Sequence, residues 1–511
     1  MEKSSRSAQK RDQTTAKKPE ITRIKKTRQP FPIVGIGASA GGLEAIEQFL
    51  RHVPENSGVA FVIIQHLDPT HKGIMPELLQ RVTDMQVFLV KDRMKVEPDC
   101  VYQIPPNRDM SILNGVLHLF EPEAPRGLRL PIDFFFRSLA EDRQELSIGV
   151  ILSGMGSDGT LGLRAIKEKA GLVVAQEPAS AQFDSMPRSA IDKGLADIVA
   201  TAEELPGKIV AYLRHLPFID VASSALEEKQ KSALEKIIIL LRTRTGHDFS
   251  LYKKNTLYRR IERRMGIHQI DRIAAYVRFL QENPQEIDLL FKEQLIGVTS
   301  FFRDPEEWEI LSTEVIPAML AAHPAGGTIR AWSAGCSTGE EAYSFAIAFK
   351  ETLEKIKPRV RYTLQLFATD LDRDAIDKAR LGLYPAGIES NISATRLRRF
   401  FVEEEKGYRV GREIREMVTF ATQNLIMDPP FTRLDILLCR NLLIYLTAEL
   451  QKKLIPLFHY SLLPGGKLFL GSAETINNFD DLFVPLHAKT RLFKRRESLL
   501  RTEPVAFPVT F

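Results

Sequence analysis

Short apolar runs alternate with stretches of helical spacing along residues 31–217. The run Val59–Ile64 is continuously apolar, and Ile148–Ser153 and Gly171–Ala175 have the same character. Between Leu43 and Leu50, apolar residues recur at helical spacing. Apolar strands separated by amphipathic helices are typical of a parallel sheet covered by helices. This part of the chain is therefore predicted to form a doubly wound α/β domain.

The pattern changes at residue 218. Up to residue 300, apolar residues at helical spacing lie among many charges with almost no strand signal, which predicts a linker helix and a small helical subdomain. Strands are predicted again at Ile329–Ser333, Tyr362–Thr369 and Leu434–Cys439. Antiparallel elements are expected around Tyr408–Thr422 and Lys467–Gly471.

The predicted fold class is α/β, with two doubly wound, Rossmann-like parallel-sheet domains. The second domain is preceded by the helical subdomain and carries a small antiparallel β insertion. The predicted organisation is a tail, a first domain, a linker with the helical subdomain, a second domain and a second tail, at residues 1–30, 31–217, 218–300, 301–500 and 501–511.

Length and composition fit several buried cores. Of 511 residues, 44% are hydrophobic and 26% are charged, which excludes collagen-like, coiled-coil and wholly disordered chains. The longest apolar stretches, such as Lys236–Leu241, fall far short of a membrane span, and the N-terminus lacks the apolar core of a signal peptide. Cys100, Cys336 and Cys439 lie too far apart for a disulfide framework or a metal site. We therefore expect a cytoplasmic protein without a metal and without membrane insertion.

The net charge of +5 is concentrated at the N-terminus. Residues 1–30 carry ten Lys or Arg against three acidic residues, whereas the remainder has a net charge of −2. A polar tail of this kind cannot bury enough apolar surface to fold. We expect the tail to be disordered and its charge to aid solubility rather than to bind nucleic acid.

Residues 37–42 (GASAGG) lie between a predicted strand and a predicted helix. Small neighbours allow Ser39 to occupy a sharp turn with an exposed hydroxyl, as in a nucleophile elbow. The same stretch also fits the dinucleotide pattern G-x-G-x-x-A. A dinucleotide site requires an acid at the end of the next strand, where this chain has Gln65 and His66, and this favours a hydrolase.

A serine nucleophile needs a base and an acid that orients the base. His66 ends a predicted strand and Asp158 lies in the glycine-rich turn 154–159, so both are expected at the sheet edge where Ser39 lies. The chain order Ser, His, Asp differs from the three common triad orders, so a general hydrolase fold does not explain it. Each residue alone also fits a structural role, and only their joint placement favours catalysis.

Four segments resemble the catalytic domain of CheB-type chemotaxis methylesterases: residues 34–46 (VGIGASAGGLEAI), 65–79 (QHLDPTHKGIMPELL), 154–159 (GMGSDG) and 176–191 (QEPASAQFDSMPRSAI). The resemblance implies that Ser39 is the nucleophile, His66 the general base and Asp158 its partner, with oxyanion N–H groups at Ala40 and Met155. It also implies hydrolysis of γ-glutamyl methyl esters on receptors, with glutamine deamidation as a further reaction. The family's usual receiver domain does not fit into the thirty residues before this domain, which puts control by phosphorylation in doubt.

A second candidate site begins at Ser333–Glu341, where small residues between a strand and a helix let a ligand approach the backbone. Asp370 ends the next strand, a position from which a carboxylate can bind two ribose hydroxyls. The nicotinamide pattern would need three glycines, and only Gly335 and Gly339 are present. Polar residues at 423–425 and 438–445 suit an adenosine-bearing ligand, although Asn424 and Asn441 fit capping or turn roles equally well.

These segments, together with residues 298–304 (VTSFFRD) and 472–474 (SAE), resemble CheR-type protein-glutamate methyltransferases. The resemblance implies S-adenosylmethionine as the methyl donor. The residues that it assigns to the donor are Thr299, Arg303, Glu340, Glu341, Asp370, Asn424, Leu425, Arg440 and Asn441. It places Tyr445 on the substrate side of the pocket. Gly297 stands where many members have a polar donor contact.

Residues 251–280 form a basic stretch, with eight Lys or Arg and two acidic residues. At helical spacing Arg260 and Arg264 share a face, as do Arg259 and Arg263. A solvated charge run is the default interpretation, and RNA binding is disfavoured because no stacking aromatics are interleaved. A methyltransferase acting on Glu-rich helices would need such a positive surface, so we assign these four arginines to substrate binding.

The sequence thus predicts a bifunctional signalling enzyme of the chemotaxis type. It would methylate receptor glutamates with S-adenosylmethionine and hydrolyse the resulting esters. The expected partners are cytoplasmic helices of chemoreceptors, with histidine kinase or response-regulator proteins as further partners and no nucleic acid. A signalling scaffold that binds partners without turnover remains the alternative.

Overall fold

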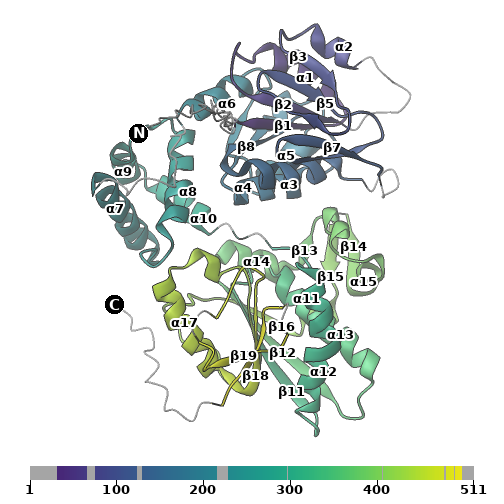
Figure 1. Cartoon of the computed structure of the whole chain (residues 1–511), viewed down its shortest axis with the longest axis vertical. Helices are drawn as coiled ribbons and strands as arrows, with labels where there is room; N and C mark the ends of the chain where they lie inside the picture. The colour runs from purple at the N-terminus through teal and green to yellow at the C-terminus, as the bar shows by residue number, and fades with distance from the viewer. Residues whose placement is uncertain are drawn as a thin grey trace, which may run out of the picture.

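The computed structural model describes residues 31–65, 75–122, 129–215, 228–295, 297, 299–405, 407–476, 479–487 and 490–497. These residues form two α/β units with a helical subdomain beside the junction between them (Figure 1). We refer to residues 31–215 as the first unit, to the helices between residues 228 and 294 as the helical subdomain, and to residues 299–497 as the second unit. His66, the predicted general base, lies outside the described residues.

The first unit is built on a parallel sheet of seven strands in the order β10-β9-β8-β1-β2-β5-β3. Its central strand β1 (Ile33–Ala38) is buried at every position, as expected for a strand whose two faces are both covered by helices. The other strands are β2 (Ala60–Gln65), β3 (Gln86–Leu89), β5 (Cys100–Gln103), β8 (Ser147–Ile151), β9 (Leu172–Gln176) and β10 (Ile198–Ala200). The prediction of a parallel α/β fold is confirmed here.

Helices cover both faces of this sheet, and each face has its own apolar core. On one face lie α1 (Gly42–Arg51), α2 (Met75–Gln80) and α6 (Leu205–Arg214). On the other face lie α3 (Pro131–Arg143), α4 (Thr160–Glu168) and α5 (Ser185–Asp192). A small antiparallel sheet beside α3 consists of β4 (Met94–Lys95), β6 (Asp109–Leu113) and β7 (Val116–Phe120).

The helical subdomain consists of α7 (Glu228–Thr245), α8 (Lys254–Ile267), α9 (Ile273–Glu282) and α10 (Pro284–Gln294). Apolar residues at helical spacing, including Leu234, Leu241, Ile261 and Leu280, meet in one buried cluster, as their spacing predicts. Among all helices of the described residues, none combines the length and apolarity that a membrane crossing requires.

The second unit has a seven-stranded sheet in the order β16-β12-β11-β17-β18-β20-β19. The first five strands are parallel to one another, whereas the last two pairings, β18–β20 and β20–β19, are antiparallel. The strands are β11 (Gly327–Ala334), β12 (Tyr362–Asp370), β16 (Val418–Thr422), β17 (Leu434–Cys439), β18 (Leu462–Leu470), β19 (Phe483–Pro485) and β20 (Leu492–Arg495). The antiparallel pairing expected at Lys467–Gly471 is confirmed by the pair β18–β20, although β18 also pairs with β17 in parallel. The antiparallel direction expected for the residues now in β16 is wrong, because an apolar run carries no information about which neighbour a strand pairs with.

A small antiparallel sheet is inserted between β12 and β16, as predicted. It consists of β13 (Leu383–Tyr384), β14 (Phe401–Glu404) and β15 (Gly407–Val410) in the order β13-β15-β14. The helices of the second unit are α11 (Pro305–Ile310), α12 (Ile316–Ala321), α13 (Glu340–Ile356), α14 (Arg373–Leu381), α15 (Ala394–Phe400), α16 (Arg412–Arg415) and α17 (Ala448–Ser461).

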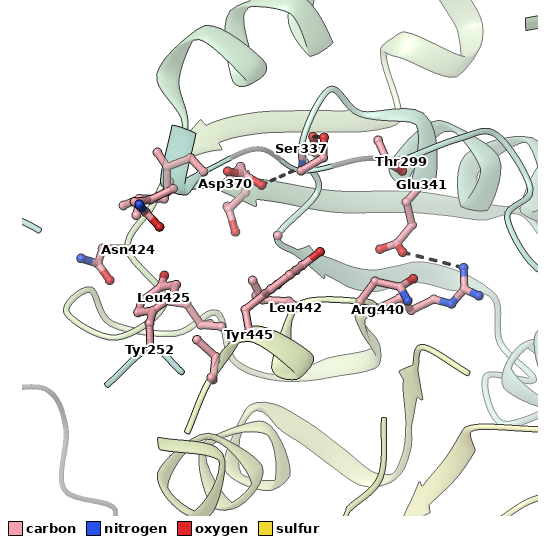
Figure 2. Close-up of a pocket in the computed structure, with 18 of the residues that line it drawn as sticks. Tyr252, Thr299, Ser337, Glu341, Asp370, Asn424, Leu425, Arg440, Leu442 and Tyr445 are labelled. Carbon is pink, nitrogen blue, oxygen red and sulfur yellow. Dashed lines mark hydrogen bonds and ion pairs between the residues drawn. The ribbon is translucent and has the colours of Figure 1, made fainter. Parts of the chain in front are cut away.

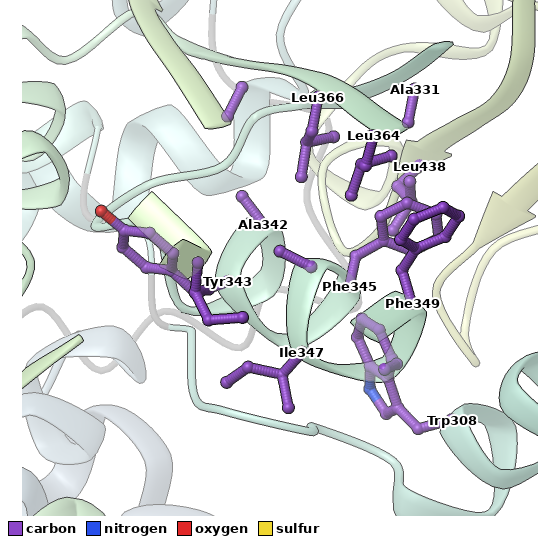
Figure 3. Packing of buried hydrophobic residues seen from close by; sticks show 14 of the residues in the cluster. Trp308, Ala331, Ala342, Tyr343, Phe345, Ile347, Phe349, Leu364, Leu366 and Leu438 are labelled. Atoms are coloured by element: carbon purple, nitrogen blue, oxygen red, sulfur yellow. The ribbon is translucent and has the colours of Figure 1, made fainter. Parts of the chain in front are cut away.

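Helix α13 is the central element of the core of the second unit. Its residues from Glu340 to Phe349 are all buried. Phe345 and Phe349 pack with Leu364 and Leu366 of β12, and Trp308 of α11 lies beside them (Figure 3). This packing fixes the first turn of α13, which opens directly at the second candidate site.

Candidate functional site

Ser39 lies in a tight turn between β1 and α1. Its N–H donates to the carbonyl oxygen of Ser153 at 3.0 Å, and the N–H of Gly42 donates to the carbonyl oxygen of Ser39 at 2.9 Å. Gly41 has a φ of 68°, and a Cβ there would lie 2.5 Å from Oε1 of Gln182. Glycine is therefore required for α1 to begin so soon after Ser39, and the turn is a strand-to-helix elbow.

A shallow pocket adjoins Ser39. Its lining comes from the start of α1, from the end of β2 and from a neighbouring loop: Gly41, Gly42, Leu43, Glu44, Glu47, Gln65 and Gln182. In the parallel pair β1–β2, Ala38 is opposite Gln65. Ser39 and His66 therefore directly follow the ends of two neighbouring strands in the sequence. His66 itself lies outside the described residues.

Asp158 is buried on the loop after β8. Its carboxylate accepts hydrogen bonds from the N–H groups of Ile132 at 3.1 Å, Asp133 at 3.0 Å and Gly159 at 2.8 Å. The first two bonds join Asp158 to the N-terminal turn of α3, and a carboxylate is favourable there. Burial, followed by the charge of Asp158, raises the pKa of the neighbouring Asp133. Asp158 does not line the pocket at Ser39, so its role as the partner of the base stays a prediction.

The two predicted oxyanion positions flank Ser39 in different ways. Ala40 directly follows Ser39, and its carbonyl oxygen accepts a hydrogen bond from the Ser153 hydroxyl at 3.0 Å. Met155 is 60% exposed on the loop after β8. The preceding residue, Gly154, is so close to Ser39 that a Cβ on it would lie 3.1 Å from that of Ser39. Both loops therefore adjoin the serine, and the role of their N–H groups stays a prediction.

The second site is organised by the turn between β11 and α13. The N–H groups of Gly335 and Cys336 donate to the carbonyl oxygen of Thr369 at 2.8 and 2.9 Å, so this turn lies against the end of β12. Gly339 has a φ of 94°, and a Cβ there would lie 2.9 Å from the Cβ of Ala379. Since only glycine fits this conformation and this space, α13 can begin immediately beside the cavity.

Asp370 ends β12 and is directed into the same cavity. Its Oδ2 accepts a hydrogen bond from the N–H of Ser337 at 2.8 Å, and its Oδ1 accepts one from the N–H of Asp372 at 2.9 Å. Burial raises its pKa, while these main-chain donors act in the opposite direction. A carboxylate held in this way has remaining lone pairs for a pair of hydroxyl donors.

Eight of the nine predicted donor residues line one cavity of the second unit (Figure 2). Asn424 and Leu425 lie at one end, and Glu341 and Arg440 at the other. The full set is Thr299, Arg303, Glu341, Asp370, Asn424, Leu425, Arg440 and Asn441. Tyr445, predicted on the substrate side, lines the same cavity.

Glu340 is the exception among the predicted donor residues. Its carboxylate accepts a hydrogen bond from the Thr338 hydroxyl at 2.6 Å and lies 3.9 Å from the guanidinium of Arg164 in the first unit. Neighbouring helix residues point about 100° apart, so Glu340 and Glu341 cannot both face the cavity. Glu340 does not line the cavity, and its carboxylate belongs to the junction between the units.

The contacts of Arg440 are mainly ion pairs with acidic side chains of the protein. Its side chain is 1% exposed and forms ion pairs at 2.7 Å with both Asp304 and Glu307. Its guanidinium also lies 4.0 Å from Glu341, whose pKa is raised to about 7 by burial. These contacts hold the end of β17 against the segment that carries Arg303.

Glu474 holds the loop after β17 in place. We did not assign this residue to the site from the sequence, although it belongs to the segment 472–474 (SAE). Its carboxylate accepts hydrogen bonds from the N–H groups of Asn441 at 2.9 Å, Gly471 at 2.7 Å and Leu443 at 2.7 Å. Asn441 adopts a φ of 60° in this loop. Glu474 therefore positions Asn441 and, further along the loop, Tyr445.

Five residues of the helical subdomain, none of which we predicted, cover part of the cavity: Tyr252, Thr256, Leu257, Gln294 and Leu295. The N–H of Lys253 donates to the carbonyl oxygen of Tyr445 at 2.9 Å, and the N–H of Thr447 donates to that of Leu251 at 3.0 Å. This pair of main-chain bonds attaches the helical subdomain to the loop that carries Tyr445.

The predicted basic face on α8 is corrected by the structure. Arg260, Arg263 and Arg264 are only 7%, 1% and 9% exposed, whereas Arg259 is exposed. Arg263 pairs with Asp197 and Glu293, and Arg264 pairs with Glu286. Charge spacing along the sequence could not reveal this burial, because the acidic partners come from other elements. Arg260 instead lines the cavity, with its guanidinium 5.9 Å from the ring centre of Tyr445.

The cavity has the chemistry that an adenosine-bearing, zwitterionic ligand needs. Oε1 of Gln423 and the side-chain amide of Gln294 line it and are buried without a hydrogen-bond partner among the described residues. Buried polar atoms of this kind are costly unless a ligand or water satisfies them. Together with Asp370, Glu341 and Asn424, they supply acceptors and donors along the whole cavity, so the residues present fit S-adenosylmethionine.

Family models match both units and the helical subdomain. The model of CheB methylesterase matches residues 34–209. The model of the all-alpha domain of CheR methyltransferase matches residues 232–293, and that of its SAM-binding domain matches residues 297–492.

Individual relatives give the same division. A putative protein-glutamate methylesterase/protein-glutamine glutaminase of Leptospira interrogans is 33% identical over 34% of this chain and 91% of its own length. A chemotaxis protein methyltransferase of Listeria innocua is 31% identical over 46% of this chain and 86% of its own. An uncharacterised 104.1 kDa protein of Rhodobacter capsulatus is 38% identical over 82% of this chain, which spans only 46% of that relative's length.

Proposed function

Because the chain belongs to the CheB methylesterase family through its first unit and to the CheR methyltransferase family through the helical subdomain and second unit, we propose that it both forms and removes methyl esters on receptor glutamates. The observation that carries the proposal is the cavity of the second unit, where the predicted donor residues converge with Tyr445. The Ser39 elbow supports the opposing reaction.

The methyltransferase reaction needs a donor held next to a carboxylate. When bound, S-adenosylmethionine supplies an electrophilic methyl group on a sulfonium. Asp370, Oε1 of Gln423 and the side-chain amide of Gln294 would bind and orient the donor; the Gln423 oxygen and the Gln294 amide have no hydrogen-bond partner among the described residues. Arg303 would contribute to the donor side of the cavity. Arg260 would hold the acceptor as an anion, because a nearby cation favours the charged form of a carboxyl group. Positioning would then supply most of the rate enhancement.

The esterase reaction would use the serine elbow. His66 would take the proton from the Ser39 hydroxyl while the oxygen attacks the ester carbonyl, and N–H groups at Ala40 and Met155 would stabilise the oxyanion. Methanol leaves with that proton, and water hydrolyses the acyl-serine to free the glutamate and the enzyme. The same steps on a glutamine side chain would release ammonia, so deamidation is a further proposed reaction.

Receptor helices rich in glutamate are the proposed substrates of both sites. The three cysteines are all free thiols, as is typical of proteins from a reducing compartment, so we propose the cytoplasm as the location.

The test is incubation of the protein with S-adenosylmethionine labelled in its methyl group and with receptor fragments. We expect label in receptor glutamates, followed by release of labelled methanol. Ser39→Ala should leave the label on the receptor and stop its release as methanol. Donor binding without any transfer to the receptor would instead support a scaffold that binds without turnover.

A further inference from the structure

Gln294 contributes a buried, unpaired amide to the wall of the donor cavity. It is the last residue of α10, it is only 8% exposed, and it lines the cavity. Neither Oε1 nor Nε2 of its side chain has a hydrogen-bond partner in the part of the chain that the structure describes. Leaving both polar atoms of a buried amide unsatisfied costs free energy. The position therefore suits a contact that a ligand completes.

The end of α10 lies next to Asp370. Near this end, Nζ of Lys292 donates to Oδ2 of Asp374 at 2.6 Å, in the first turn of the helix that follows β12. Beyond the end of α10, the carbonyl oxygen of Gly297 accepts a hydrogen bond from the Ser337 hydroxyl at 3.3 Å. Ser337 also donates its N–H to the carboxylate of Asp370. The last turn of α10 is thus held over the end of β12.

A second set of contacts joins α10 to the Asn424 end of the cavity. Phe291 lies three residues before Gln294, a spacing that places both on one side of the helix. The ring of Phe291 stacks on that of His247, with centroids 5.2 Å apart and planes inclined by 8°. Nδ1 of His247 lies 3.3 Å from Nδ2 of Asn424, within hydrogen-bond distance. These contacts place Gln294 between Asp370 and Asn424.

This part of the cavity suits the base of the donor. Figure 2 shows Asn424 and Leu425 at one end and Glu341 and Arg440 at the other, with Asp370 between them. We assigned Asp370 to the ribose hydroxyls, and the base is attached to that ribose. The ammonium of the donor matches the carboxylate of Glu341, so the uncharged base extends toward the opposite end, where Leu425 offers an apolar side chain.

We infer that the amide of Gln294 pairs with the amino edge of the adenine ring and makes the donor site selective for that base. Adenine presents an N–H donor beside a ring-nitrogen acceptor, and a glutamine amide forms two hydrogen bonds with such an edge. Both unpaired atoms of Gln294 are then satisfied at once. This inference rests on the donor function proposed for the second unit. It assigns recognition of the base to the helical subdomain rather than to the sheet that carries Asp370.

The first test compares two ligands by calorimetry with the full chain: S-adenosylhomocysteine and its analogue in which unsubstituted purine replaces adenine. We expect the wild type to bind the adenine compound at least about ten-fold more tightly, because the analogue leaves Oε1 of Gln294 unpaired. Gln294→Met keeps the length of the side chain and removes both polar atoms, so this preference falls below about three-fold. Gln281→Met, at an exposed position of α9, keeps the wild-type preference. Equal preference in the wild type and in Gln294→Met overturns the inference.

The unfolding temperature separates a ligand contact from a structural role. Gln294→Met removes unsatisfied buried atoms and leaves no cavity, so the ligand-free variant should unfold at the wild-type temperature or above it. Addition of S-adenosylhomocysteine should raise this temperature less than in the wild type, because binding to the folded state is weaker. A ligand-free variant that unfolds at a lower temperature than the wild type would show that the amide supports the fold, and this would overturn the inference.

Both measurements need neither a receptor nor methyl transfer, so they separate the base contact from the reaction. Loss of the preference in Gln294→Met, in a protein whose wild type methylates no receptor, supports the base contact and refutes the proposed function. A wild type that methylates receptors and an unchanged preference in Gln294→Met refute the base contact alone.

Discussion

The two α/β units use the same device, a glycine-rich turn between a strand and a helix, to build sites of opposite shape. In the first unit the turn leaves Ser39 at a shallow pocket on the sheet edge. In the second unit the turn forms one wall of a cavity that the helical subdomain partly covers. The shape of each site depends on the elements that pack over the turn. The glycine-rich turn alone does not predict which kind of site it forms.

This difference follows from what each proposed reaction must hold. The ester substrate is part of a large receptor, which itself positions the ester at the nucleophile. Water is the second reactant, so an open site suffices. A small methyl donor must be retained and aligned with a carboxylate, which requires contacts on several sides. The four changes below test this contrast in order of decreasing effect.

Ser39→Ala is expected to have the largest effect. Loss of the nucleophile should lower the rate of methanol release from methylated receptor by at least about 10³-fold, since triad members act as a unit. Donor affinity, measured by calorimetry, should not change, because the cavity belongs to the other unit. Ser111→Ala in the small antiparallel sheet is the matched control. Methanol release near the wild-type rate in Ser39→Ala would show that the elbow is not the esterase site.

Arg263→Met should disturb the junction between the units rather than either site. The variant leaves Glu293 buried without the cation of Arg263 and Asp197 with Lys167 as its remaining partner, a change that costs about 3–5 kcal/mol. We expect a lower unfolding temperature and separate transitions for the two units in calorimetry. Arg259→Met, on the exposed side of the same helix, should shift stability by less than about 0.5 kcal/mol. Equal stability of the two variants would contradict the buried ion pairs.

Asp370→Asn should weaken donor binding by about 1.5–3 kcal/mol, or roughly ten- to one-hundred-fold, because charge-assisted hydrogen bonds are lost. Asp372→Asn provides a nearby control, since that side chain caps α14 and does not line the cavity. It should leave both stability and donor affinity nearly unchanged, because asparagine caps a helix about as well as aspartate. Calorimetry with equal donor affinities in both variants would argue against Asp370 as a donor ligand.

Arg259→Gln should have the smallest effect. Arg259 is the exposed member of the four arginines assigned to receptor binding. A single exposed charge contributes little attraction, so the receptor KM should rise by less than about two-fold and only at low salt. A larger rise that persists at high salt would restore α8 as a receptor-binding surface.

The sequence predicted the parts of the fold and of the sites that depend on local pattern. Apolar strands, the helical subdomain and the glycine turns before Ser39 and Glu340 are all readable from neighbouring residues. The strand-end position of Asp370 follows in the same way, because the residue after a buried run lies at the sheet edge. The strand Val418–Thr422 was nevertheless expected to be antiparallel and is parallel to its neighbour β12, since pairing depends on segments far away in the chain.

The missed features depend on residues that are distant in sequence. Glu340 and Glu341 differ only in the side of α13 on which they lie, and that side is set by the packing of Phe345 and Phe349 on the sheet. The burial of Arg263 depends on Asp197, which belongs to another unit. No local signal distinguishes Gln294 from other polar residues at a helix end, although its side-chain amide lines the cavity without a hydrogen-bond partner in the described part of the chain.

The bonds of the helical subdomain have a consequence for the order in which the chain assembles during synthesis. All partners that attach α8 to the first unit, including Asp197 and Gly171, precede α8 in the chain. The main-chain partners at Tyr445 and Thr447, which attach the subdomain to the donor site, are translated much later. Domains generally fold in order from the N-terminus as they leave the ribosome. We therefore expect the helical subdomain to pack first against the esterase unit. The second unit would then fold and pack against the subdomain, which completes the methyltransferase.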